Sequence, residues 1–116
     1  MVKVFIVDDQ KVVLRGLRKT IPWEDYGCTI VGESTNGREA LEKCSLLKPD
    51  IVITDICMPV MDGLSFINEL KRITRHVKIV ILTAYNEFEY AKAALENGTR
   101  KYLLMICTLK NGQPLK

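Results

Sequence analysis

The chain has 116 residues, of which 47% are hydrophobic, and a formal charge of +3 at neutral pH. This length suits one domain with a core that needs neither disulfides nor a structural metal. Lys and Arg are mixed with Asp and Glu, which argues against the clustered basic surface of a nucleic-acid-binding domain. No apolar run is long enough for a signal peptide or a membrane span, and the cysteines form no C-x-x-C pair. We therefore expect a soluble, cytoplasmic protein with free thiols and no membrane partner.

Short runs rich in Val and Ile recur along the chain with helical segments between them. The runs are residues 2–7, 29–32, 51–54, 77–83 and 102–106. They are mostly continuous rather than alternating, which predicts strands that are buried on both faces. Helical spacing is carried by Leu14, Leu17 and Ile21; by Ala40, Leu41, Cys44 and Leu47; by Phe66, Ile67, Leu70 and Ile73; and by Phe88, Ala91 and Leu95. Glu39 and Lys43 are four residues apart with the acid first, which supports the second helix.

Alternation of strands and helices predicts an α/β fold, a doubly wound five-stranded parallel sheet with helices on both faces. Because crossovers between parallel strands are right-handed, the simplest strand order is 2-1-3-4-5. In this order the first helix covers one face of the sheet, and the second, third and fourth helices cover the other.

Acidic residues follow two strands that are neighbours in this order. Asp8 and Asp9 end the first strand and Asp55 ends the third, on either side of the point where the strand order reverses, which is where such sheets bind ligands. Three carboxylates repel one another, and a hard cation such as Mg²⁺ would relieve this. Taken singly, the acid pair reads as a helix N-cap, Asp55 as a loop cap and Thr83 as an ordinary strand residue. Their conjunction at three strand ends favours a site.

The sequence resembles the receiver domain of two-component response regulators, whose fold is flavodoxin-like (CheY-like). The resemblance runs from Lys3 to about Leu104. It rests on the segments VDD at 7–9, PDIVITD at 49–55, MPVMDG at 58–63, ILTA at 81–84 and KYLL at 101–104. We expect a receiver domain over residues 1–106 and an atypical tail over residues 107–116.

The resemblance implies a role for each matching residue around the acids. Asp55 would be the phosphoacceptor, served by a sensor histidine kinase. Asp9 would bind Mg²⁺ directly, Asp8 would hold its water ligands, and the backbone carbonyl of Cys57 would be a third ligand. Such a domain is not an ordinary enzyme but a switch that catalyses its own phosphorylation and dephosphorylation.

The resemblance also implies a switch and an output. Thr83 would contact the phosphoryl group and move toward it, and the ring of Tyr102 would follow. Residues 21–24, 32–41 and 83–91 are similar to regulators that carry an AraC-type DNA-binding domain. This chain does not contain that domain, so DNA would be a partner only through a longer parent protein.

The chain departs from the family pattern after its fifth strand. The family has a lysine where this sequence has Met105, and a thioether cannot replace the ammonium charge. An alternative is therefore a phosphate-independent pseudo-receiver. A haloacid-dehalogenase-type phosphatase would need a second acid where Cys57 stands. A flavodoxin would need a phosphate-binding loop where Asp8 and Asp9 would repel the phosphate.

The tail, residues 107–116, contains Asn111-Gly112 and Pro114 and does not match the amphipathic fifth helix of the family. We expect that helix to be missing or atypical. The last two strands would then keep an apolar face uncovered, which predicts a homodimer or a loss of stability.

Overall fold

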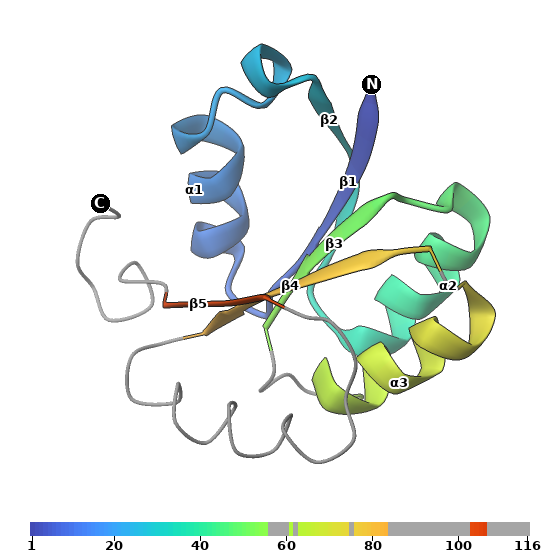
Figure 1. Cartoon of the computed structure of the whole chain (residues 1–116). Helices are drawn as coiled ribbons and strands as arrows, with labels where there is room; N and C mark the ends of the chain where they lie inside the picture. Colours follow the sequence, from blue (N-terminus) through green and yellow to red (C-terminus); the bar gives the residue numbers. More distant parts are fainter. Residues whose placement is uncertain (56–60, 62, 75, 84–102, 107–116) are drawn as a thin grey trace.

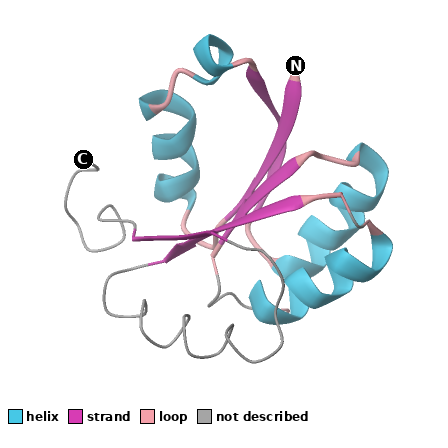
Figure 2. Cartoon of the chain, in the orientation of Figure 1, coloured by secondary structure: helices cyan, strands magenta, loops and turns pink. Residues whose placement is uncertain are grey.

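The computed structural model describes residues 1–55, 61, 63–74, 76–83 and 103–106, and it shows one parallel sheet flanked by helices (Figures 1 and 2). The elements in chain order are β1 (Val2–Val7), α1 (Lys11–Thr20), the 3-10 helix η1 (Trp23–Tyr26), β2 (Cys28–Ser34), α2 (Gly37–Leu47), β3 (Ile51–Thr54), α3 (Gly63–Ile73), β4 (Lys78–Thr83) and β5 (Leu103–Ile106). The sheet order is β2-β1-β3-β4-β5 and every neighbouring pair is parallel. The predicted fold class and strand order are confirmed.

The predicted element bounds agree closely with the observed ones. β1 and β3 have the predicted bounds, β2 is longer and reaches Ser34, and β4 begins at Lys78 rather than at Val77. The fourth predicted helix, Tyr102 and the whole tail lie outside the described residues. The predictions on the tail, on the missing fifth helix and on the uncovered sheet face therefore stay predictions.

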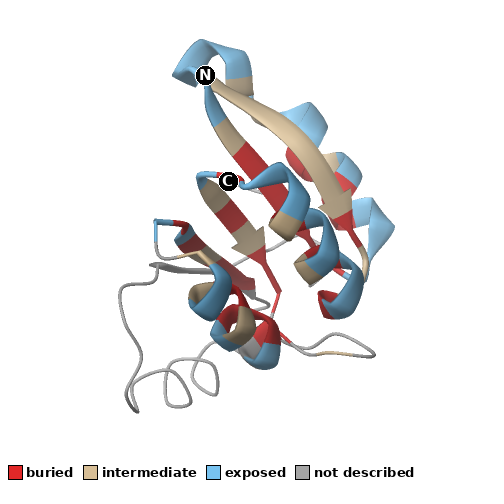
Figure 3. Ribbon diagram, turned by 90° about the vertical axis from the view of Figure 1, so that its right-hand side faces the viewer, coloured by how far each residue is buried: buried red, intermediate tan, exposed pale blue. Residues whose placement is uncertain are grey.

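β1 lies at the centre of the core and supplies side chains to both faces of the sheet. Val4 and Ile6 pack with α1 on one face, while Phe5 and Val7 pack with α2 and α3 on the other. All four are at most 2% exposed, and the buried stretch of the strand is visible in Figure 3. Alternation of side chains along an extended strand produces this division, and burial on both faces explains why the strand reads as a continuous apolar run.

The helices meet the sheet through most of the residues that their spacing predicted. Leu47 and Ile73 were predicted on the buried faces but are exposed, and Val13 is buried without having been predicted. From α1 the buried contacts are Val13, Leu14 and Leu17, and from α2 and α3 they are Ala40, Cys44, Phe66, Ile67 and Leu70. Figure 1 shows α1 on one side of the sheet and the other two helices on the opposite side. None of the helices in the described part of the chain has the length and apolar character needed to cross a bilayer.

The contact of α1 with the sheet can be tested by truncating one buried side chain. Leu14 is 1% exposed in the cluster that joins α1 to β1. We expect Leu14→Ala to lower the free energy of unfolding by about 2–5 kcal/mol, since it leaves a cavity in a packed core. Val12 lies on the same helix and is 56% exposed. Val12→Ala should change stability by less than about 0.5 kcal/mol. Urea unfolding of both variants would measure the difference, and equal losses would contradict this assignment of the buried face.

Candidate functional site

The three predicted acids meet at the carboxyl ends of β1 and β3. These strands pair in parallel with Val7 opposite Thr54, so that the residues after them are neighbours. The backbone N–H of Asp55 donates to the carbonyl oxygen of Val7 at 3.1 Å, which holds the two strand ends together. One carboxylate oxygen from each of Asp8, Asp9 and Asp55 lies within 4.8 Å of the others. We call these three residues the acidic cluster.

The acidic cluster is closed on the protein side and open on the solvent side. Asp8 and Asp55 are each 1% exposed, whereas Asp9 is exposed. One Asp8 carboxylate oxygen, Oδ1, accepts the backbone N–H of Gln10 at 2.9 Å, which orients that side chain at the start of α1. Three carboxylates at this separation repel one another, and burial of two of them strengthens the repulsion. A hard divalent cation with oxygen ligands, reached from the Asp9 side, fits this donor set.

A polar turn beyond β2 supports the acidic cluster from the backbone. The carbonyl oxygen of Ser34, at the end of β2, accepts the backbone N–H of Asp8 at 3.1 Å. The buried Ser34 hydroxyl donates to the carbonyl oxygen of Asn36 at 2.9 Å and accepts the Asn36 N–H at 3.3 Å. Asn36 in turn caps α2, because its side-chain oxygen accepts the N–H of Glu39 at 2.8 Å. We call Ser34–Asn36 with Glu39 the Ser34 turn.

The sequence-based predictions assign no role to Ser34 or to Asn36, the N-cap residue of α2. A signal was available, because Asn-x-x-Glu resembles the capping pattern of a helix N-terminus. The contact between the Ser34 carbonyl and Asp8 had no such signal, since it depends on the pairing of two strands far apart in sequence.

The pKa values of two side chains on α2 are shifted in opposite directions, one by a neighbouring charge and one by burial. The hydrogen bond from Lys43 at 3.0 Å, followed by its charge, holds the pKa of the Glu39 carboxyl below its usual range. This ion pair confirms the predicted pairing on the solvent side of α2. Burial raises the pKa of the Cys44 thiol to about 12. Cys44 is therefore a protonated core residue, and Cys28 and Cys44 are both free thiols as predicted.

The other predicted site residues are placed only in part. Thr83 is the last residue of β4, which pairs with β3, so its backbone lies at the same edge of the sheet as the acidic cluster. Met105 is in β5, opposite Leu82 of β4. Cys57 and Tyr102 lie outside the described residues. The structure thus brings together the three acids and the strand that carries Thr83.

The family of response regulator receiver domains matches residues 4–110 of the chain. The chain belongs to this family. The chain is 41% identical over 107 residues to YesN of Bacillus subtilis, an uncharacterised transcriptional regulatory protein. This match covers 92% of the chain and 29% of YesN. It is 38% identical over 104 residues to the transcriptional regulatory protein HptR of Staphylococcus aureus, covering 90% of this chain and 40% of HptR. The receiver therefore spans well under half of these relatives.

Solved structures show the same likeness. The receiver domain of AraT from Geobacillus stearothermophilus has a TM-score of 0.79 and 34% identity, and the match covers 90% of this chain and 81% of that one. A two-component transcriptional regulator AraC from Clostridium phytofermentans has a TM-score of 0.77 and 25% identity over the same shares. The resemblance to the AraC branch of response regulators is thus confirmed.

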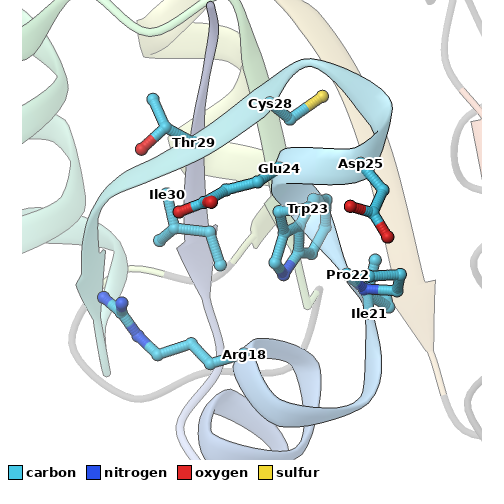
Figure 4. Close-up of a pocket in the computed structure, with 9 residues that line it drawn as sticks. All are labelled: Arg18, Ile21, Pro22, Trp23, Glu24, Asp25, Cys28, Thr29 and Ile30. Carbon is cyan, nitrogen blue, oxygen red and sulfur yellow. The ribbon is translucent and has the colours of Figure 1, made fainter.

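A surface pocket of about 460 Å³ lies near the opposite edge of the sheet, between α1, η1 and the start of β2 (Figure 4). Two of its polar side chains bond to neighbouring elements. Trp23 donates its indole N–H to the carbonyl oxygen of Leu17 at 3.0 Å, and Arg18 pairs with Glu33 at 2.7 Å. These bonds tie η1 and β2 to α1, so the pocket reads as a structural junction of the receiver, separate from the acidic cluster.

The charge of the acidic cluster generates a prediction about divalent cations. Asp9→Asn keeps the shape of the side chain but removes a charge and a strong ligand. Mg²⁺ at 100 times its dissociation constant should stabilise the wild-type receiver by about 2.7 kcal/mol. We expect a much smaller gain for Asp9→Asn, measured by thermal unfolding with and without Mg²⁺.

The matched control for this prediction is Asp25→Asn, which changes an exposed acid of η1 far from the acidic cluster. This variant should keep the full Mg²⁺-dependent gain. Equal gains in Asp9→Asn and Asp25→Asn would mean that Mg²⁺ acts on the receiver without using the acidic cluster.

Proposed function

We propose that this receiver accepts a phosphoryl group on Asp55 from a sensor histidine kinase in the presence of Mg²⁺. The observation that carries the proposal is the convergence of Asp8, Asp9 and Asp55 at the ends of β1 and β3, within 4.8 Å of one another. The receiver unit would comprise residues 1–106, with residues 107–116 as a separate tail. The family match, which runs to residue 110, supports this unit without deciding its boundary.

The transfer would be an in-line displacement at phosphorus. A carboxylate oxygen of Asp55 attacks the phosphorus of a phosphohistidine, and a bond from phosphorus to that oxygen forms. The bond from phosphorus to the imidazole nitrogen breaks, and its electron pair stays on the nitrogen. Asp9, Asp55 and the backbone carbonyl of Cys57 would hold Mg²⁺ directly, and Asp8 would hold its waters. When bound, Mg²⁺ supplies positive charge that offsets the repulsion between the carboxylate and the phosphoryl oxygens.

The protein's own contribution is to hold the nucleophile in place. The amide of Asp55 is bonded to Val7, and the buried Thr54 hydroxyl donates to the Asp55 carbonyl oxygen at 2.9 Å. Both bonds restrain the Asp55 backbone, so little orientation entropy is lost when the donor arrives. The Thr83 hydroxyl would contact the phosphoryl group from the end of β4, and Tyr102 would follow it in the switched state.

The output would be control of transcription by a DNA-binding domain elsewhere in a longer parent protein. The names of YesN and HptR, of which the chain spans 29% and 40%, support this proposal. RcsB from Salmonella enterica, with a TM-score of 0.72 and 28% identity, was solved bound to promoter DNA in the presence of the phosphomimetic BeF3⁻. We also propose that the protein acts in the cytoplasm and that this chain can form a homodimer.

Phosphorylation at Asp55 is tested by mass spectrometry after exposure to acetyl phosphate and Mg²⁺. We expect the wild-type receiver to gain the mass of one phosphoryl group on the peptide that contains Asp55. Asp55→Asn should gain none, because an amide is a poor nucleophile and cannot form an acyl phosphate. Asp25→Asn is the matched control and should be labelled like the wild type. Labelling of Asp55→Asn at the wild-type level would overturn the assignment.

A second candidate function is a phosphate-independent pseudo-receiver, which Met105 favours. In the register of β4 and β5, Met105 is opposite Leu82, one residue before Thr83. The resemblance to the family gives this position to a lysine. Without that ammonium group, a phosphoryl group on Asp55 would lose one positively charged partner. This loss would weaken the response to phosphorylation more than it weakens metal binding, since the metal ligands come from β1 and β3.

Met105→Lys separates these two functions. If the receiver is an active switch that lacks one cation, the variant should be labelled faster or hold its phosphoryl group longer, by up to about 10-fold for one charged hydrogen bond of 1.5 kcal/mol. Its affinity for Mg²⁺ should change much less. The measurement is the time course of labelling and decay by intact mass. A variant that behaves like the wild type in both respects would contradict the proposed role of position 105.

A further inference from the structure

Gly37, the first residue of α2, is packed against the backbone of Met61. A Cβ atom built on Gly37 would lie less than 3.0 Å from the carbonyl oxygen of Met61. Real Cβ atoms essentially never come this close to another heavy atom. The Met61 carbonyl carbon and Cβ would each lie at 3.1 Å. The obstacle is main chain rather than the end of a flexible side chain, so it cannot rotate away.

The backbone conformation of Gly37 does not by itself call for glycine. Among the described residues, positive φ angles occur at Gly27 and Lys48, not at Gly37. Alanine would also favour a helical position over glycine. Close approach to Met61 is therefore the physical reason for glycine at this position.

Met61 lies in the segment that joins Asp55, at the end of β3, to Gly63, at the start of α3. Its side chain packs against the same core cluster as Ala40 and Cys44 of α2. Met61 is thus held by the core through its side chain and by the start of α2 through its backbone. The chain that leaves the nucleophile has a fixed point six residues later, at position 61.

The start of α2 is itself fixed to the acidic cluster. Asn36, the residue before Gly37, is bonded to Ser34 through both its carbonyl oxygen and its N–H. Ser34 in turn accepts the N–H of Asp8 through its carbonyl oxygen. A continuous path of short contacts therefore runs from Asp8 through the Ser34 turn to Gly37 and Met61, and Met61 is the sixth residue after Asp55 in the sequence.

We propose that Gly37 is a positioning residue that fixes the main chain at Met61, six residues after Asp55, and thereby the geometry of the acidic cluster toward Mg²⁺ and the phosphoryl donor. This inference rests on the proposed function. Gly37 acts through the Met61 backbone and touches neither the metal nor the reacting atoms. Loss of groups that orient metal ligands typically costs about 10–100-fold in metal affinity or activity, and we expect a shift of Met61 to act in this way.

The test compares two Gly→Ala variants that differ in what the added methyl group meets. Gly37→Ala meets the Met61 backbone, whereas Gly32→Ala meets the side chains of Phe5, at 2.9 Å, and Leu47, at 3.1 Å, in β2 away from the acidic cluster. We expect Gly37→Ala to raise the half-saturating Mg²⁺ concentration about 10-fold and to lower the labelling rate at saturating Mg²⁺. Gly32→Ala should lower the unfolding temperature and leave the Mg²⁺ titration unchanged.

Isothermal titration with Mg²⁺ and labelling by acetyl phosphate give separate readouts. A Mg²⁺ titration of Gly37→Ala that matches the wild type would overturn the inference, and so would an equal shift in Gly32→Ala. If the wild-type receiver binds Mg²⁺ but takes up no phosphoryl group, the proposed function fails while the Mg²⁺ comparison still tests Gly37.

A second variant keeps the inference testable if Gly37→Ala does not fold. Ser34→Ala adds no volume and removes the hydroxyl that fixes Asn36 before the start of α2. It leaves the Ser34 carbonyl bonded to Asp8. We expect Ser34→Ala to shift the Mg²⁺ titration in the same direction as Gly37→Ala. A folded Ser34→Ala receiver with the wild-type titration would overturn the inference.

Discussion

The parallel pairing of β1 with β2 on one side and β3 on the other determines where the functional groups of this receiver lie. The backbone N–H of Asp8 is held by the end of β2, and that of Asp55 is held by the end of β1. Because parallel strands end at the same edge of a sheet, these two bonds bring three carboxylates from two distant parts of the chain together. A shift of β1 by one residue would exchange its two faces and separate the acids at the same time.

The acidic cluster carries an electrostatic cost that the surrounding core must offset. Asp8 and Asp55 are almost completely buried next to a third carboxylate, and carboxylates at this separation repel one another. Hydrophobic clusters on both faces of β1 hold the strand ends in place despite this repulsion. A cation held by the proposed site would relieve this repulsion, and its binding would then add to the stability of the receiver.

The two ends of the parallel strands differ in how their polar groups are used. At the start of β2, the Trp23 indole bonds to the Leu17 carbonyl oxygen and joins η1 to α1. The Arg18 guanidinium pairs with Glu33, next to Ser34, and joins α1 to β2. At the carboxyl ends of the strands, backbone groups and the Ser34 turn hold the acidic cluster, while Asp9 stays exposed to solvent. Solved relatives such as the AraT receiver share this overall fold.

The amino-acid sequence by itself determined the fold class, the strand order and the acidic cluster. Strands buried on both faces leave continuous apolar runs, and residues that follow the first and third strands must be neighbours once the crossovers are right-handed. Tertiary structure alone decided how the cluster is supported. The bond from Asp8 to Ser34 and the approach of Gly37 to Met61 join segments far apart in the chain. Each contact requires the separation of two packed elements to be correct to within a few tenths of an ångström. No periodicity or residue type carries such distances, because they are set by how whole strands and helices pack against one another.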